Sequence, residues 1–167
     1  MDRLTDHRYA ELIQAALAMV PGRLRATLRQ AHFLTGVDPL WVGLHAYEAM
    51  SHGRSYRTEA HVVCPFHQMV PKGERHITVV LPGLKPVRVI IHELGHVLDW
   101  FLGLRHSVRP ITDYAETNRE EAFAEAFTAW VGPPEYRERC VQEPFYSDGQ
   151  TTALFRRLQV EGAPWPI

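Results

Sequence analysis

The feature that most constrains this chain is the run His92-Glu93-Leu94-Gly95-His96, in which two histidines stand four residues apart. On a helix such residues lie on one face, so both imidazoles can reach a single metal ion. Glu93 lies beside them, where it can hold and deprotonate a water molecule on the metal instead of binding the metal itself. The motif therefore predicts a helix that binds a metal.

The residues around the motif favour this helix. Polar residues that could bind a metal, namely His92, His96 and Asp99, fall together on one side of it. The prolines and glycine of 82–86 break the preceding strand just before the helix begins. We expect the helix over about residues 87–101. Its other side carries apolar residues at helical spacing, which are Ile90, Ile91, Leu94, Val97, Leu98 and Phe101.

Two histidines do not complete a zinc site, because catalytic zinc usually has three protein ligands. The metzincin arrangement would need Gly and His where this chain has Asp99 and Leu102, so that class is excluded. Better candidates are Glu121 and Glu125, which stand one turn apart on a second expected helix. A carboxylate is costly to bury without a partner, and a metal with its histidines supplies one. Asp99 stays open as an alternative third ligand.

The second helix has recognisable ends. Thr117 or Asn118, each with a Glu three residues on, makes a capping box at its start. The residues Gly132-Pro133-Pro134 end the helix after about Val131. Of the remaining acidic residues, we expect Glu116 and Glu120 to be solvated and to serve in capping. The apolar side of the helix consists of Ala122, Phe123, Ala126, Phe127 and Trp130.

The two blocks together resemble the gluzincin metallopeptidases. Within them they are most similar to the anthrax lethal factor-like peptidases, which include Pro-Pro endopeptidases. The resemblance covers roughly residues 76–131 and rests on the segments 92–99 and 114–127. It implies an α+β, zincin-like metallopeptidase domain that binds Zn²⁺ through His92, His96 and Glu121. The connection between the two blocks is short, which leaves the substrate preference open.

The resemblance also implies a role for the other polar residues. Glu93 would be the general base of peptide hydrolysis, and the hydroxyl of Tyr114 would stabilise the tetrahedral intermediate. Glu125 would orient a histidine ligand from behind, and we expect the same of Asp99. The implied activity is that of a zinc-dependent endopeptidase acting on an extended protein or peptide.

A chain of 167 residues fits one domain with a proper core. We expect a helical scaffold over 1–50, a catalytic core over 56–131 and a C-terminal extension over 132–167. The further elements that the patterns predict are helices over 8–20, 23–33, 39–50, 134–141 and 151–160, a turn over 35–37, and strands over 56–64 and 76–81.

Other classes of partner fit the sequence poorly. Residues 35–48 loosely resemble a helix-turn-helix, but the second helix offers almost no Arg, Lys, Asn or Gln for DNA, and the net charge is −1. No apolar run approaches the roughly 20 residues of a membrane span. The N-terminus lacks a signal-peptide pattern, and Cys64 and Cys140 form no pair motif, so we expect a cytoplasmic protein with reduced thiols. The alternative to an enzyme is a catalytically silent peptidase-fold protein within a larger assembly.

Overall fold

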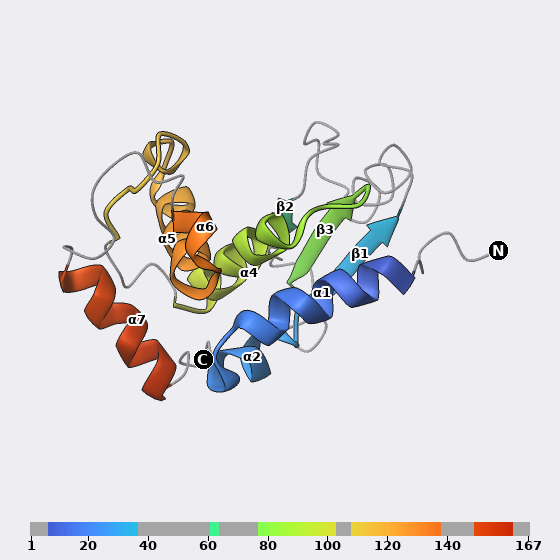
Figure 1. The fold of residues 1–167 in the computed structure, drawn as a ribbon, viewed down its shortest axis with the longest axis horizontal. Coiled ribbons are helices and arrows are strands. Elements are labelled where there is room, and N and C mark those ends of the chain that lie inside the picture. Colours follow the sequence, from blue (N-terminus) through green and yellow to red (C-terminus); the bar gives the residue numbers. More distant parts are fainter. Residues whose placement is uncertain (1–6, 37–60, 64–76, 103–107, 138–148, 162–167) are drawn as a thin grey trace, which may run out of the picture.

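The computed structural model describes residues 7–36, 61–63, 77–102, 108–137 and 149–161 (Figure 1). This part of the chain is mostly helical and has one small sheet, which agrees with the expected α+β class in a broad sense. The helices are α1 (His7–Met19), α2 (Gly22–Leu28), α4 (Val87–Leu102), α5 (Arg119–Val131), α6 (Pro134–Arg137) and α7 (Gly149–Glu161), with one 3₁₀ turn, η2 (Tyr114–Glu116). The strands are β1 (His32–Gly36), β2 (His61–Val63) and β3 (Thr78–Pro82).

The sheet has β3 at its centre. The strand order is β1-β3-β2, with β1 parallel and β2 antiparallel to β3. Val79, Val80 and Leu81 of β3 have no exposed surface, as expected for a central strand covered on both faces. The predicted strand over 76–81 is thus confirmed, two residues later at its start. Of the predicted strand over 56–64, the described residues 61–63 do form a strand.

The N-terminal prediction was wrong at one place. The second helix ends at Leu28 instead of continuing to Phe33, and residues 32–36 form β1 where a turn over 35–37 was expected. The reason is long-range pairing, since β1 runs parallel to β3 from His32 beside Thr78 to Gly36 beside Pro82. The region 1–50 is therefore not a purely helical scaffold. The helix expected over 39–50 lies outside the described residues.

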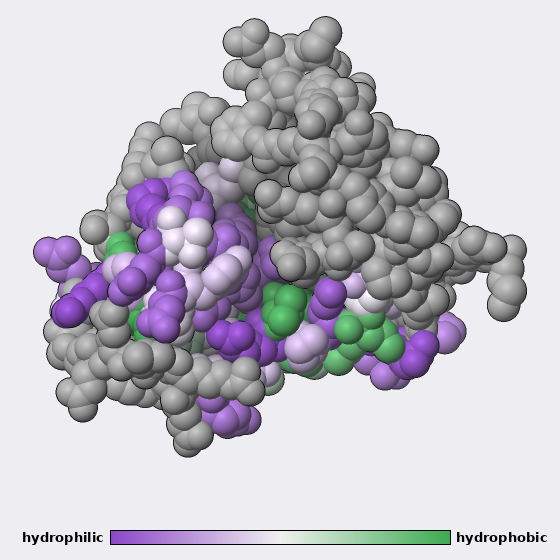
Figure 2. Space-filling model, turned by 90° about the horizontal axis from the view of Figure 1, so that it is seen from above, coloured by the Kyte–Doolittle hydropathy of each residue, from purple (hydrophilic) through white to green (hydrophobic). Residues whose placement is uncertain are grey.

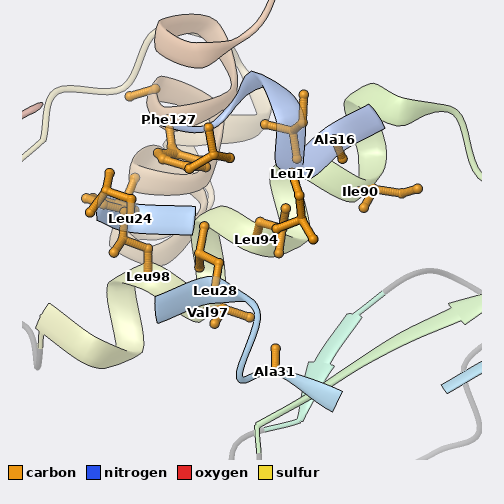
Figure 3. Packing of buried hydrophobic residues seen from close by; sticks show 14 of the residues in the cluster. Ala16, Leu17, Leu24, Leu28, Ala31, Ile90, Leu94, Val97, Leu98 and Phe127 are labelled. Atoms are coloured by element: carbon orange, nitrogen blue, oxygen red, sulfur yellow. The ribbon is translucent and has the colours of Figure 1, made fainter. Parts of the chain in front are cut away.

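Helix α4 runs through the middle of the fold, after a turn at Gly83 that has a positive φ of 70°. Its predicted apolar side is confirmed, except that Phe101 is only partly buried. Figure 3 shows this side packed against α1 and α2, including Leu17, Leu24 and Leu28. Each fully buried side chain of this size stabilises the fold by about 1.5–3 kcal/mol. The residues of α4 with no exposed surface are Ile90, Ile91, Leu94, Val97 and Leu98.

Helices α4 and α5 cross at Gly95. A Cβ atom at this position would lie only 2.8 Å from the Cα atom of Ala124 on α5. The two backbones can come this close because Gly95 has no side chain and Ala124 has a small one. As a result, the histidine face of α4 lies directly against the glutamate face of α5.

On its other side, α5 packs against α7 through aromatic rings. Trp130 stacks on Phe155, with ring centroids 4.8 Å apart and an interplanar angle of 10°. Phe123 and Phe127 also contact Phe155, with centroids at 5.5 and 6.2 Å. The predicted last helix and its inward residues, Leu154, Phe155 and Leu158, are confirmed. None of the described helices is long and apolar enough to cross a membrane.

Candidate metal centre

The two histidines of the motif lie together near the middle of α4. Their rings meet edge to face with centroids 4.9 Å apart, and their Nε2 atoms are 3.2 Å apart. His92 is buried, with 9% of its surface exposed, and His96 is partly buried. The helical spacing of four residues thus turns the same nitrogen of both rings toward one point.

Glu121 reaches the same point from α5. Its Oε2 atom lies 3.0 Å from Nε2 of His92 and 3.3 Å from Nε2 of His96. Helix α5 begins where it does because the side chain of Asn118 accepts a hydrogen bond from the backbone N–H of Glu121, at 2.8 Å. Of the two predicted capping residues, Asn118 is the one that caps. This cap sets the first turn of α5, which carries Glu121, against the histidines.

The three donor atoms form a triangle suited to a metal. Its sides of 3.0, 3.2 and 3.3 Å resemble the distance of about 3.3 Å between two ligands that each lie 2.0–2.1 Å from a tetrahedral ion. His92, His96 and Glu121 could therefore hold a metal ion. Among the described residues, this group does not include Asp99, the alternative third ligand.

The charges of the site depend on one another in the metal-free protein. Burial lowers the pKa of His92, but hydrogen bonds to Glu121 and Glu125, together with the negative charges of Glu93 and Glu125, outweigh burial and raise this pKa to about 9. Burial would raise the pKa of both glutamates, yet the hydrogen bond to His92 and neighbouring positive charges bring each below its ordinary value. In the metal-free protein the ionised carboxylates of Glu121 and Glu125 therefore balance the positive charge of a protonated His92.

Glu125 lies behind His92, one turn along α5 from Glu121. Its Oε1 atom is 2.8 Å from Nδ1 of His92, and since a carboxylate can only accept, Nδ1–H donates this bond. Arg88 donates to the same carboxylate, at 3.0 Å to Oε2, and Thr112 donates to Oε2 at 3.3 Å. The bond at Nδ1 leaves Nε2 of His92 to face His96 and Glu121. The structure thus brings Glu125 to the place expected of a residue that orients a ligand.

Glu93 is buried beside the histidines, with 4% of its surface exposed. Its Oε2 atom has no hydrogen-bond partner among the described residues. Burial raises the pKa of this carboxyl, while the charges of His96 and His92 oppose the rise. A buried carboxylate oxygen without a partner is rare in native proteins and is typical of a functional site. The free Oε2 atom of Glu93 could bind a polar group that approaches the donor atoms of His92, His96 and Glu121.

Tyr114 lies on the open side of the cluster. It belongs to η2, is 56% exposed, and its ring centroid lies 5.9 Å from that of His92. Seen from above, the surface around α5 and η2, on the left of Figure 2, is largely hydrophilic. The phenol is therefore at the edge of the site, where a molecule in solution can reach it.

The remaining predicted residue, Asp99, is buried on α4 and pairs with Arg119 at 3.4 Å. This pair connects α4 to the start of α5, and so it supports the arrangement of the two helices. Arg119 also contacts Glu120, which is exposed as expected. Cys64 lies outside the described residues.

Three residues at the site were not singled out from the sequence. The glycine in the middle of an otherwise helical pattern, Gly95, was a usable signal for a close helix crossing. Arg88, four residues before His92, lies on the histidine face, and this spacing could have indicated a contact. Thr112 gave no local signal, because its contact with Glu125 depends on the tertiary fold.

The chain matches none of the family models, curated proteins or solved structures with which it was compared. Functional inference therefore rests on the residues and on the geometry of the site.

Proposed function

We propose that this chain is a zinc-dependent endopeptidase with a zincin-like fold. The observation that carries the proposal is the convergence of His92, His96 and Glu121 beside the buried carboxylate of Glu93. Helices supply all four side chains, α4 three of them and α5 the fourth. This is the arrangement that the motif and the resemblance predict.

Two imidazoles and one carboxylate are a donor set typical of catalytic zinc, which keeps its remaining position open for water or substrate. When bound, the ion would supply Lewis-acid chemistry, polarising a carbonyl group and lowering the pKa of water. His92, His96 and Glu121 would hold it. Glu125 keeps the imidazole of His92 in the orientation and tautomer that binding requires, because it accepts the bond from Nδ1.

Glu93 is the proposed general base. Its Oε2 atom would accept a proton from the attacking water and then release it to the leaving amine. Burial raises the pKa of this carboxyl above its ordinary value, which makes it a stronger base than an exposed glutamate. The pKa of Glu93 therefore lies closer to those of water and of an amine, so less free energy separates a proton on Glu93 from a proton on either of these groups.

Tyr114 is the proposed donor to the oxyanion. Its ring lies beside His92 on the exposed side of the cluster, where a scissile carbonyl would approach. Such a hydrogen bond, made mainly in the transition state, typically contributes about 2.7–4 kcal/mol. β2 is an outer strand of the described sheet, and an extended peptide could bind there by strand addition.

The substitution Glu93→Gln tests the proposal. It keeps the size of the side chain but removes its basicity, so we expect cleavage of a peptide library to fall by about 10²–10⁴-fold while the zinc content stays unchanged. Glu120→Gln is the matched control, since Glu120 is an exposed glutamate on the same helix as Glu121.

Two results would contradict the proposed function. One is a zinc-loaded protein that cleaves no peptide of the library. The other is a Glu93→Gln variant that cleaves as fast as the native chain. Either result would favour the alternative, a peptidase-fold protein that acts by interaction alone.

A further inference from the structure

The hydroxyl group of Thr112 makes two contacts that point to different parts of the site. Thr112 is buried, with 8% of its surface exposed. Its Oγ1 atom accepts a hydrogen bond from the backbone N–H of Ala115 at 3.0 Å and donates one to Oε2 of Glu125 at 3.3 Å. A hydroxyl can do both at once because it carries one donor hydrogen and two lone pairs.

The contact with Ala115 caps the turn that carries Tyr114. Asp113, which directly precedes the turn, has helical backbone angles and no side-chain capping bond, so the hydroxyl of Thr112, three residues before Ala115, supplies the cap instead. The turn itself is held by 3₁₀ bonds, Glu116 N–H to Asp113 at 3.2 Å and Thr117 N–H to Tyr114 at 3.1 Å. Such short turns have poor hydrogen-bond geometry, so the side-chain cap matters for where the turn sits.

The contact with Glu125 reaches the other half of the site. His92 contacts the Glu125 carboxylate at Oε1, Thr112 contacts it at Oε2, and Arg88 donates to both oxygens. Because the orientation of the His92 ring depends on this carboxylate, a shift of Glu125 would move the ring. Thr112 therefore lies one hydrogen bond from the turn of Tyr114 and two from the imidazole of His92.

We propose that Thr112 is a positioning residue that couples the placement of the Tyr114 phenol to that of the His92 imidazole through its one hydroxyl group. The inference rests on the proposed function, which gives Tyr114 and His92 their roles. It goes beyond that function because it assigns the relation between the two rings to Thr112, whose described hydrogen bonds go to Glu125 and Ala115.

Two other residues distinguish this coupling from a general loss of structure. Arg88 binds both oxygens of the same carboxylate from α4, at 3.2 and 3.0 Å, so Arg88→Met removes support from Glu125 while the Thr112–Ala115 bond stays in place. Thr128 is a matched control, because it is buried on α5 and its hydroxyl donates only to the carbonyl of Ala124, at 2.8 Å, among the contacts described. Replacing either threonine by valine keeps the shape and removes the hydroxyl.

The experiment follows two quantities in the full chain. Zinc affinity is measured by competition with a chromophoric chelator, which reports on His92. The environment of Tyr114 is measured by fluorine NMR of protein labelled with 3-fluorotyrosine, with the resonance assigned by Tyr114→Phe. We expect Thr112→Val to weaken zinc binding roughly tenfold, at the lower end of the effects of such supporting residues, and to shift or broaden the Tyr114 resonance.

The other variants give the matching expectations. Thr112→Ser retains the hydroxyl and so retains zinc affinity and the native resonance. Arg88→Met weakens zinc binding but leaves the Tyr114 resonance in place, and Thr128→Val changes neither quantity. If Thr112→Val does not fold, Thr112→Ala removes the same hydroxyl with less bulk and takes its place.

The coupling is overturned if removal of the hydroxyl leaves both quantities unchanged, or if Thr112→Ser behaves like Thr112→Val. A shift of the Tyr114 resonance in Arg88→Met as large as in Thr112→Val would overturn it too, since Glu125 alone would then set the turn. Neither readout requires peptide cleavage. A chain that shows the coupling and cleaves nothing would refute the proposed function alone.

Discussion

Helix α5 has two sides that meet their neighbours by opposite means. Toward α4 the contact is close and polar, with Ala124 against Gly95 and the carboxylates of Glu121 and Glu125 beside His92. Toward α7 it is built from aromatic rings, of which Trp130 and Phe155 stack at 4.8 Å. The difference suggests that one side serves the site and the other serves the stability of the helix that carries it.

The polar contacts between α5 and α4 are expected to contribute little to the stability of the fold. Buried charges cost desolvation free energy that their mutual attraction repays only in good geometry, and apolar replacements are often as stable. Here His92 bonds to both Glu121 and Glu125, and Arg88 pairs with Glu125 at 3.0 Å. These charged groups are buried despite the desolvation free energy, and they lie next to the Oε2 atom of Glu93, which has no hydrogen-bond partner among the described residues. A role in binding explains this arrangement better than a role in folding.

The largest effect on folding is expected on the aromatic side. Phe155→Ala removes a ring with no exposed surface from between Phe123, Phe127 and Trp130, and should lower the free energy of unfolding by about 3–5 kcal/mol. Zinc affinity of the folded protein should not change. Urea unfolding and zinc titration below the unfolding transition measure the two. If zinc affinity fell by as much free energy as the stability does, the proposed division of α5 into a side for stability and a side for the site would be wrong.

A smaller effect on folding, with a larger one on the site, is expected at the helix crossing. The Cβ atom added by Gly95→Ala would lie 2.8 Å from the backbone of Ala124, so the helices must separate. We expect a cost of about 1–3 kcal/mol in unfolding free energy. We also expect a roughly tenfold loss of zinc affinity, which corresponds to 1.4 kcal/mol. The same two measurements apply.

The control for this substitution is Gly149→Ala at the start of α7. A Cβ atom there would meet nothing within 4 Å, so stability and zinc affinity should both stay near the native values. Native zinc affinity in Gly95→Ala would show that the close crossing is not what brings the ligands together.

A further effect is expected from pH, through the protonation of His92 on the polar side. In the metal-free protein the pKa of His92 is raised from 6.5 to about 9, so its contribution to stability is fully present below pH 6.5 and is lost as the pH rises through 9. The free energy of unfolding of chelator-treated protein should therefore fall from pH 6.5 to pH 9. Phe155→Ala should show the same fall from a lower starting value, and Glu125→Gln a smaller one. Equal free energies of unfolding of the native chain at pH 6.5 and pH 9 would contradict the ion pairs of the polar side.

The sequence predicted the elements of both sides better than their contacts. Hydrophobic periodicity and end signals located α4, α5 and α7 within a few residues, and the spacing of His92, His96 and the two glutamates indicated one cluster. These signals are local. Strand β1 was missed because it is specified by its parallel partner β3, some 46 residues further along the chain from His32 to Thr78. The Thr112 hydroxyl was missed for the same reason, since its partner Glu125 becomes its neighbour only in the folded chain.

The central claim is that His92, His96 and Glu121 together hold one zinc ion. Elemental analysis of the purified chain after dialysis against limiting zinc tests it most directly, with His92→Ala and Glu121→Ala beside Glu120→Ala as the exposed control. We predict about one zinc per chain in the native protein and in Glu120→Ala, as for a three-ligand catalytic site, and strong loss in the other two. Equal zinc content in all four proteins, or none in the native chain, would contradict the account.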